Sequence, residues 1–202
     1  MTALAQDEFN NDTLRKDVVH AALRNRAGLG LRVTHENGKR VEFLDFYHLR
    51  PDILDQWLKS TILEGNIRAD DFESITEVEA RNQRELSLIV GAIVLRSGNG
   101  WNDYHLAPLL VAATKQYLRE QLKAFDKVTI YATLFSNAGR RYSEIEDFKL
   151  YVHASDRGFA GGGHDVSYIT FNPKDQARKF VSVARGATFI LDVDFSLPRE
   201  HA

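Results

Sequence analysis

The chain of 202 residues contains no cysteine. This absence excludes disulfides, thiolate zinc sites and cysteine nucleophiles, and it disfavours a disulfide-stapled secreted domain. No segment approaches the roughly 18 consecutive apolar residues that a membrane-spanning helix needs. The first 17 residues carry acidic side chains where a signal peptide has a basic end and an apolar run. We therefore expect a soluble protein with no membrane partner that is not secreted by a signal peptide.

An excess of charge of one sign is also missing, because 26 Lys and Arg nearly balance 28 Asp and Glu. A formal net charge of −2 gives no overall field that would attract nucleic acid, so nucleic acid is an unlikely partner. The hydrophobic share of 44% and the charged share of 27% are those of a folded globular protein. Since no stretch has the composition of a linker, we predict one domain over residues 1–202.

Hydrophobic periodicity predicts the elements of this domain. Apolar residues recur at helical spacing in three segments, 13–27, 52–64 and 108–125. Segment 86–95 is apolar on both alternating faces, as in a strand at the centre of a covered sheet. Further strands are predicted at 29–34, 40–46, 128–135, within 148–171 and at 188–197, whereas 66–85 is interpreted as a surface segment. The predicted fold class is α+β, with a mixed β-sheet covered mainly on one side by two or three helices.

Titratable side chains, glycines and aromatics concentrate only in segment 148–171. His153, Asp156, His164 and Asp165 lie in or beside its glycine-rich connection, and nitrogen and oxygen ligands of this kind suit zinc or another divalent ion. Their spacing matches no known metal motif, so a polar, solvated loop is the preferred interpretation and we expect no bound metal.

The same connection carries two residue types that are enriched at the buried centres of protein interfaces, Arg157 and Phe159. We therefore predict an interface or ligand loop made of His153, Asp156, Arg157, Phe159, His164 and Asp165. The loop is expected to be near a contact between copies of the chain.

Established catalytic motifs are missing as well. The sequence contains no Gly-x-Ser-x-Gly elbow, no His-Glu-x-x-His helix and no dinucleotide fingerprint. Arg96-Ser97-Gly98-Asn99-Gly100 suggests a pyrophosphate-binding loop, but the same residues are ordinary turn formers. From the residues alone we predict no catalytic residue and no cofactor.

The order of elements from residue 41 to 171 resembles the acetyltransferases of the GNAT family. The resemblance rests on strand, helix, strands, the long helix 108–125 and the strand 128–135, followed by Ser136-Asn137, Tyr142 and Asp147-Phe148. In that family a Gln/Arg-x-x-Gly-x-Gly/Ala loop at the start of the long helix holds the pyrophosphate of CoA. Here His105-Leu106-Ala107-Pro108 enters the helix, so the resemblance implies an acyltransferase domain with a degenerate CoA-binding loop.

A second resemblance is to the tail-terminator and neck proteins of tailed bacteriophages. It rests on the short N-terminal helix, residues 79–84 leading into a strand, the long helix and the alternating strand near the C-terminus. Those proteins form rings and have no catalytic residues.

Our principal hypothesis is therefore a non-enzymatic assembly protein, with copies of itself and other assembly proteins as partners, in the cytoplasm or a virion. The acyltransferase domain is the alternative. A metal-dependent hydrolase that uses His153 and His164 is the third.

Overall fold

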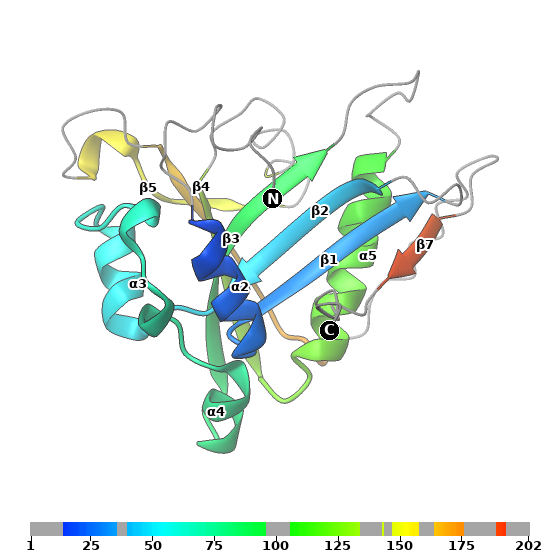
Figure 1. The fold of residues 1–202 in the computed structure, drawn as a ribbon, viewed down its shortest axis with the longest axis horizontal. Coiled ribbons are helices and arrows are strands. Elements are labelled where there is room, and N and C mark those ends of the chain that lie inside the picture. The colour runs from blue at the N-terminus through cyan, green and yellow to red at the C-terminus, as the bar shows by residue number, and fades with distance from the viewer. Residues whose placement is uncertain are drawn as a thin grey trace, which may run out of the picture.

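The computed structural model describes residues 14–35, 40–95, 106–133, 143, 147–157, 164–175 and 189–192. Side chains are described in 14–30, 44–91, 114–133, 143, 147–157 and 164–175. Within these ranges the chain forms one seven-stranded sheet in the order β5-β6-β4-β3-β2-β1-β7 (Figure 1). The strands are β1 (Gly28–His35), β2 (Arg40–Tyr47), β3 (Glu85–Leu95), β4 (Lys127–Thr133), β5 (Lys149–Val152), β6 (Val166–Phe171) and β7 (Phe189–Asp192).

The sheet is mixed because β3 and β4 are parallel while every other neighbouring pair is antiparallel. A parallel pair requires a crossover connection, and here the crossover contains α5 (Leu106–Gln121). The two-faced apolar segment 86–95 belongs to β3, the fourth of the seven strands. Its predicted central place is confirmed.

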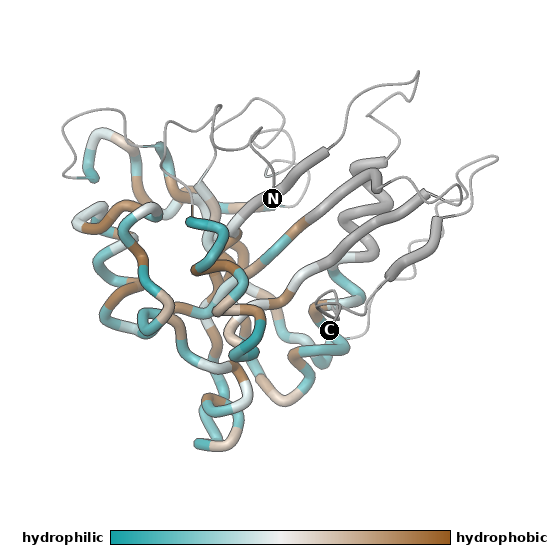
Figure 2. The backbone as a smooth tube through the Cα atoms, in the orientation of Figure 1, coloured by the Kyte–Doolittle hydropathy of each residue, from teal (hydrophilic) through white to brown (hydrophobic). Residues whose placement is uncertain are grey.

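Helices pack on the two faces of the sheet through separate apolar clusters. Helices α2 (Lys16–Arg24) and α3 (Pro51–Leu58) contribute Val18, Ala22, Ile53 and Trp57 to a cluster that also contains Tyr47 and Ile89 of the sheet. Helix α5 covers the other face, where its side chains meet apolar residues of β2, β3 and β4. Hydrophobic and hydrophilic residues alternate along α2 and α3 in Figure 2, as expected for helices with one buried side. The predicted α+β class with a mixed sheet is confirmed.

The acid-rich segment 66–85 is more than a surface segment. It contains a turn of 3-10 helix (Ala69–Asp71) and the short helix α4 (Ile75–Ala80). Its widely spaced apolar residues Ile67, Phe72, Ile75 and Val78 are buried. Too few apolar residues mark a single face for periodicity to detect them, which is why the sequence interpretation was wrong here.

No helix in the described ranges is long and apolar enough to cross a membrane. The predicted tight turn at Asn37-Gly38 lies outside the described residues.

Candidate functional site

The parallel strands β3 and β4 pair only over the first part of their length. The paired residues run from Glu85 with Lys127 to Ile89 with Tyr131. Beyond this point β3 continues to Leu95 and remains paired with β2, but it pairs with no residue of β4 as far as Thr133, where the description of that strand ends. An opening therefore begins at the carboxyl ends of two parallel strands, which is where ligands bind in open sheets that contain such pairs.

A β-bulge lies at the start of the opening. Asp45 pairs with Ala92 and Phe46 with Val90, so that Gly91 is an extra residue in β3. Bulges bend a strand and are over-represented next to active sites, where they change the direction of backbone and side-chain groups. The bulge at Gly91 lies two residues past Ile89, the last β3 residue that is paired with β4.

Two buried side chains of β2 leave no space for a Cβ atom at residue 91, which is a glycine. A Cβ at this position would overlap the ring of Tyr47 and lie 2.7 Å from Oδ1 of Asp45. The Tyr47 hydroxyl donates a 2.5 Å hydrogen bond to Oδ2 of Asp45, and both residues are fully buried. Burial raises the pKa of Tyr47 well above its ordinary value, and the neighbouring charge of Asp45 raises it further. Tyr47 therefore stays a protonated phenol, and the pair shapes the bulge.

Three tyrosines from β4, β5 and β6 cluster next to the opening. The rings of Tyr131 and Tyr151 meet edge to face at 5.3 Å, and Tyr168 lies 6.2 Å from Tyr131 and 6.0 Å from Tyr151 between ring centroids. Tyr131 is the last β4 residue paired with β3. Burial, then the neighbouring Tyr151 and Tyr168, raises the pKa of Tyr131. Tyr151 is 49% exposed, so the cluster presents aromatic surface to solvent.

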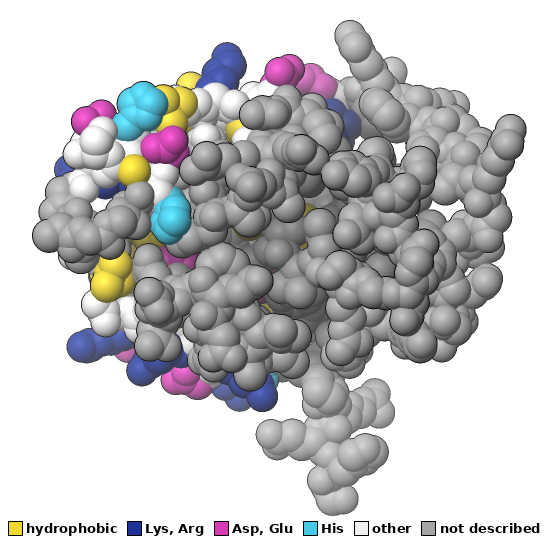
Figure 3. Space-filling model, turned by 90° about the horizontal axis from the view of Figure 1, so that it is seen from above, with side chains coloured by type: hydrophobic (Ala, Val, Ile, Leu, Met, Phe, Trp, Pro, Cys, Tyr) yellow, Lys and Arg dark blue, Asp and Glu magenta, His cyan; other side chains and the backbone are white. Residues whose placement is uncertain are grey.

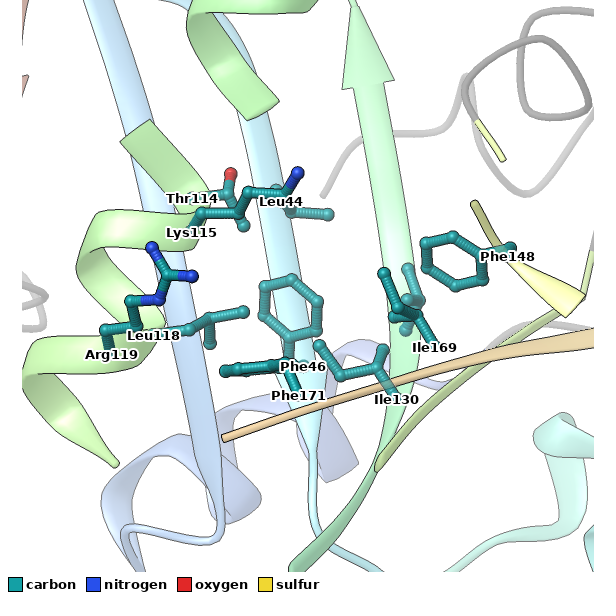
Figure 4. A pocket seen from close by; sticks show the side chains of 11 residues that line it. Leu44, Phe46, Thr114, Lys115, Leu118, Arg119, Ile130, Phe148, Ile169 and Phe171 are labelled. Carbon is teal, nitrogen blue, oxygen red and sulfur yellow. The ribbon is translucent and has the colours of Figure 1, made fainter. Parts of the chain in front are cut away.

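A pocket of about 580 Å³, including its space open to solvent, lies on the other face of the sheet beneath α5. Figure 4 shows the rings of Phe46 and Phe171 at its centre, with Thr114, Lys115 and Arg119 entering from α5. The remaining lining side chains are apolar: Leu44, Val90, Leu118, Ile130, Phe148 and Ile169. The pocket is thus an apolar hollow with polar groups on one wall.

The loop residues predicted from the sequence are only partly brought together. The carboxylate oxygen Oδ1 of Asp165 lies 3.7 Å from Nδ1 of His153 and accepts a 2.8 Å hydrogen bond from the backbone N–H of Ala154. The Asp156 side chain accepts a 3.2 Å hydrogen bond from Ser155. Histidine and acidic side chains lie side by side on the face seen in Figure 3. Among the described side chains, however, no three potential ligands gather around one metal position.

Arg157 lies inside the protein and not on its surface. Only 7% of the residue is exposed, and its guanidinium donates 2.8 Å hydrogen bonds to the carbonyls of Trp57 and His164. The guanidinium also lies 5.6 Å from the centre of the Trp57 ring, within cation–π range. Arg157 therefore joins the β5–β6 connection to helix α3. Phe159 lies outside the described residues, and the interface role of this loop remains a prediction.

Sequence reasoning missed the opening between β3 and β4, the bulge and the tyrosine cluster. The signals were present as a glycine inside an apolar strand, a Tyr two residues after an Asp, and tyrosines on strands that become neighbours only in the sheet. Gly91 in particular was available as a sign of a bulge or of close backbone approach.

Comparison with known proteins gives structural similarity only. No model of a known protein family matches the chain, and no curated protein matches its sequence. Among solved structures, the spermidine N-acetyltransferase of Vibrio cholerae in complex with CoA and spermine is 10% identical with a TM-score of 0.44, over 78% of this chain and 73% of that one. A dodecameric structure of the same enzyme gives 10% identity and a TM-score of 0.44, over 78% of this chain and 71% of that one.

These matches correct the principal hypothesis from the sequence. The similar structures are acetyltransferases, which contradicts the expectation of a phage tail-terminator or neck protein. The same finding contradicts the expectation of a non-enzymatic assembly protein and gives no support to a virion location. The phage resemblance rested on the order of common elements without any residue motif, and such an order occurs in unrelated folds.

Proposed function

We propose that the chain is an acyltransferase domain that binds an acyl thioester in the opening between β3 and β4. The observation that carries this proposal is the separation of a central parallel pair beside a bulge at Gly91. The order of elements, with a long helix between the separating strands, is the one that resembles the GNAT family. The proposal therefore replaces the non-enzymatic interpretation with its alternative.

The open edge of β3 fits the extended, amide-bearing arm of such a thioester. Among the described residues, those of β3 past Ile89 pair with β2 on one side only, so their other backbone N–H and C=O groups face the opening. An extended chain that adds to a free strand edge gains main-chain hydrogen bonds. Binding of the arm at this edge does not require a pyrophosphate-binding loop. The connection 96–105, where such a loop would occur, lies outside the described residues.

In acyl transfer, the thioester supplies an activated carbonyl group for a nucleophile to attack. In this proposal a backbone N–H group of the bulge stabilises the negative charge that develops on the carbonyl oxygen. The clustered rings of Tyr131, Tyr151 and Tyr168, of which Tyr151 is 49% exposed, offer π-faces to a positively charged acceptor. We therefore propose an amine as the acceptor class.

Calorimetric titration with acetyl-CoA tests this proposal. Thr133 is the last described residue of β4 and lies past the paired region, whereas Thr129 lies within it on the same strand face. We expect wild-type binding in the micromolar range and at least about tenfold weaker binding for Thr133→Trp, because the larger side chain narrows the opening. The matched control Thr129→Trp should bind like wild type. Absence of binding to wild type, or equal loss in both variants, would contradict the proposal.

We further propose that the chain self-associates. Strand β5 is an edge of the sheet, and it exposes two large apolar residues, Leu150 at 46% and Tyr151 at 49%. A free edge with exposed apolar side chains favours pairing with another chain. The loop that follows β5 is the one predicted from sequence to lie near a contact. A homo-oligomer in which copies of the chain meet at β5 would account for the exposed apolar residues and for the predicted position of the loop.

A further inference from the structure

The pocket beneath α5 contains a buried polar group without a partner. Thr114 is 3% exposed, and its hydroxyl oxygen makes no hydrogen bond within the described part of the chain. The Nε of Arg119, five residues further along α5 and also in the lining of the pocket, has none there either. Buried polar atoms are nearly always hydrogen-bonded, because leaving one unsatisfied costs stability. Both groups therefore indicate a ligand that supplies an acceptor.

The charged side chains that α5 contributes to the pocket indicate that the acceptor on the ligand is negatively charged. Lys115 and Arg119 both line the pocket and are four residues apart, a spacing that places them on one side of the helix. No acidic side chain is among the lining residues. Two cations and a hydroxyl on one wall favour an anion, and a carboxylate accepts hydrogen bonds from all three kinds of donor.

The other residues that line the pocket indicate that the remainder of the ligand is apolar. Phe46, Phe171, Ile130, Ile169 and Phe148 form an apolar surface opposite the cationic wall (Figure 4). The hollow is open to solvent on one side, and most of its lining is apolar. A hydrocarbon chain would fill such a hollow, whereas a small inorganic anion would leave its apolar surface in contact with water.

We propose that this pocket binds a linear fatty carboxylate, with the carboxylate at Thr114, Lys115 and Arg119 and the chain along the phenylalanine rings. The site lies on the α5 face of the sheet, opposite the tyrosine cluster, and it does not depend on acyl transfer. Its ligand could bind whether or not acetyl-CoA binds in the opening between β3 and β4.

Calorimetry with decanoate, below its micelle concentration, tests the site, with decanol and decyltrimethylammonium as matched neutral and cationic probes. We expect saturable binding of decanoate and binding of the other two probes weaker by about tenfold or more, because only the anion pairs with the cationic wall. Equal binding of decanoate and decanol, or no binding of decanoate, would overturn the proposal. A failure of acetyl-CoA to bind would leave this result unaffected.

Variants localise the binding. Arg119→Met should weaken decanoate about tenfold while leaving decanol unchanged, and Thr114→Val should weaken decanoate in the same direction. Lys123→Met, a change of an exposed residue in the turn after α5 and outside the lining, is the matched control and should bind like wild type. Ile169→Trp should abolish binding by filling the hollow. Should Ile169→Trp fail to fold, Arg119→Met and Thr114→Val decide, and unchanged decanoate binding in both would refute the site.

Discussion

The ring of Tyr47 lies so close to Gly91 that no other residue fits at position 91 without displacing it. This contact couples a buried tyrosine of β2 to the bulge of β3, at the place where β3 and β4 separate. The shape of the candidate site thus depends on the absence of a single side chain.

Gly91→Ala should lower the free energy of unfolding by about 1 to 3 kcal/mol, because the added methyl group overpacks the interior against Tyr47. Urea unfolding measures the change. In a Tyr47→Leu background, which removes the ring, the same substitution should cost less, since neighbouring residues are not additive. An equal cost in both backgrounds would show that the ring does not determine the need for glycine.

Arg157 should stabilise the β5–β6 connection. Arg157→Met removes two hydrogen bonds to carbonyls and should lower the free energy of unfolding by about 1 to 3 kcal/mol. Arg157→Lys should recover only part of this loss, because an ammonium group lacks the planar fork that reaches two separate acceptors. Chemical denaturation compares them with Lys149→Met, an exposed change in β5 that should be near neutral. If the lysine variant matched wild type, charge alone would account for the role of Arg157.

Glu73 should make stability depend on pH in the acidic range. Burial opposes ionisation, but hydrogen bonds from Arg81 and His48 prevail and hold the pKa of Glu73 below its usual value. The ionised form therefore stabilises the fold above the unfolded-state pKa of about 4.3, and this contribution is lost as the pH falls through the lower folded-state pKa. Glu73→Gln should flatten the loss of stability below about pH 4.3 in unfolding experiments. Glu77→Gln, an exposed change in α4, should retain the wild-type slope.

Self-association should depend on the β5 edge and on the loop that follows it. Leu150→Lys places a charge on the exposed edge and should reduce the mass measured by light scattering, as edge lysines oppose strand pairing. Phe159→Ser should act in the same direction. Wild type at monomer mass at high micromolar concentration would remove the support for an oligomer.

The sequence predicts the features of this structure that depend on residues close together in the chain. Segment 86–95 is apolar on both faces, so its central position could be predicted, and the tyrosine-bearing strands β4 and β6 were located as well. The site depends on relations between strands that periodicity does not contain. Tyr131 and Tyr168 are 37 residues apart and become neighbours only through antiparallel pairing. Likewise, nothing local indicates that β3 and β4 separate after Ile89.

Arg157 is a residue whose contacts the sequence did not indicate, because they are distant in the chain. As a residue type it favoured an interface, and in the structure its guanidinium binds Trp57, 100 positions earlier in the chain. The titratable residues around Arg157 attracted attention because they are close together in the sequence. The groups that form the opening between β3 and β4 are far apart in the sequence and did not.

The measurement that tests the central claim most directly is the mapping of backbone amide chemical shifts during titration of isotope-labelled protein with acetyl-CoA. Binding in the opening predicts saturable shifts concentrated in 90–95 of β3 and in Ala132 and Thr133 of β4, with little change in β1 or β5. Shifts confined to other parts of the chain, or none at millimolar acetyl-CoA, would contradict the account.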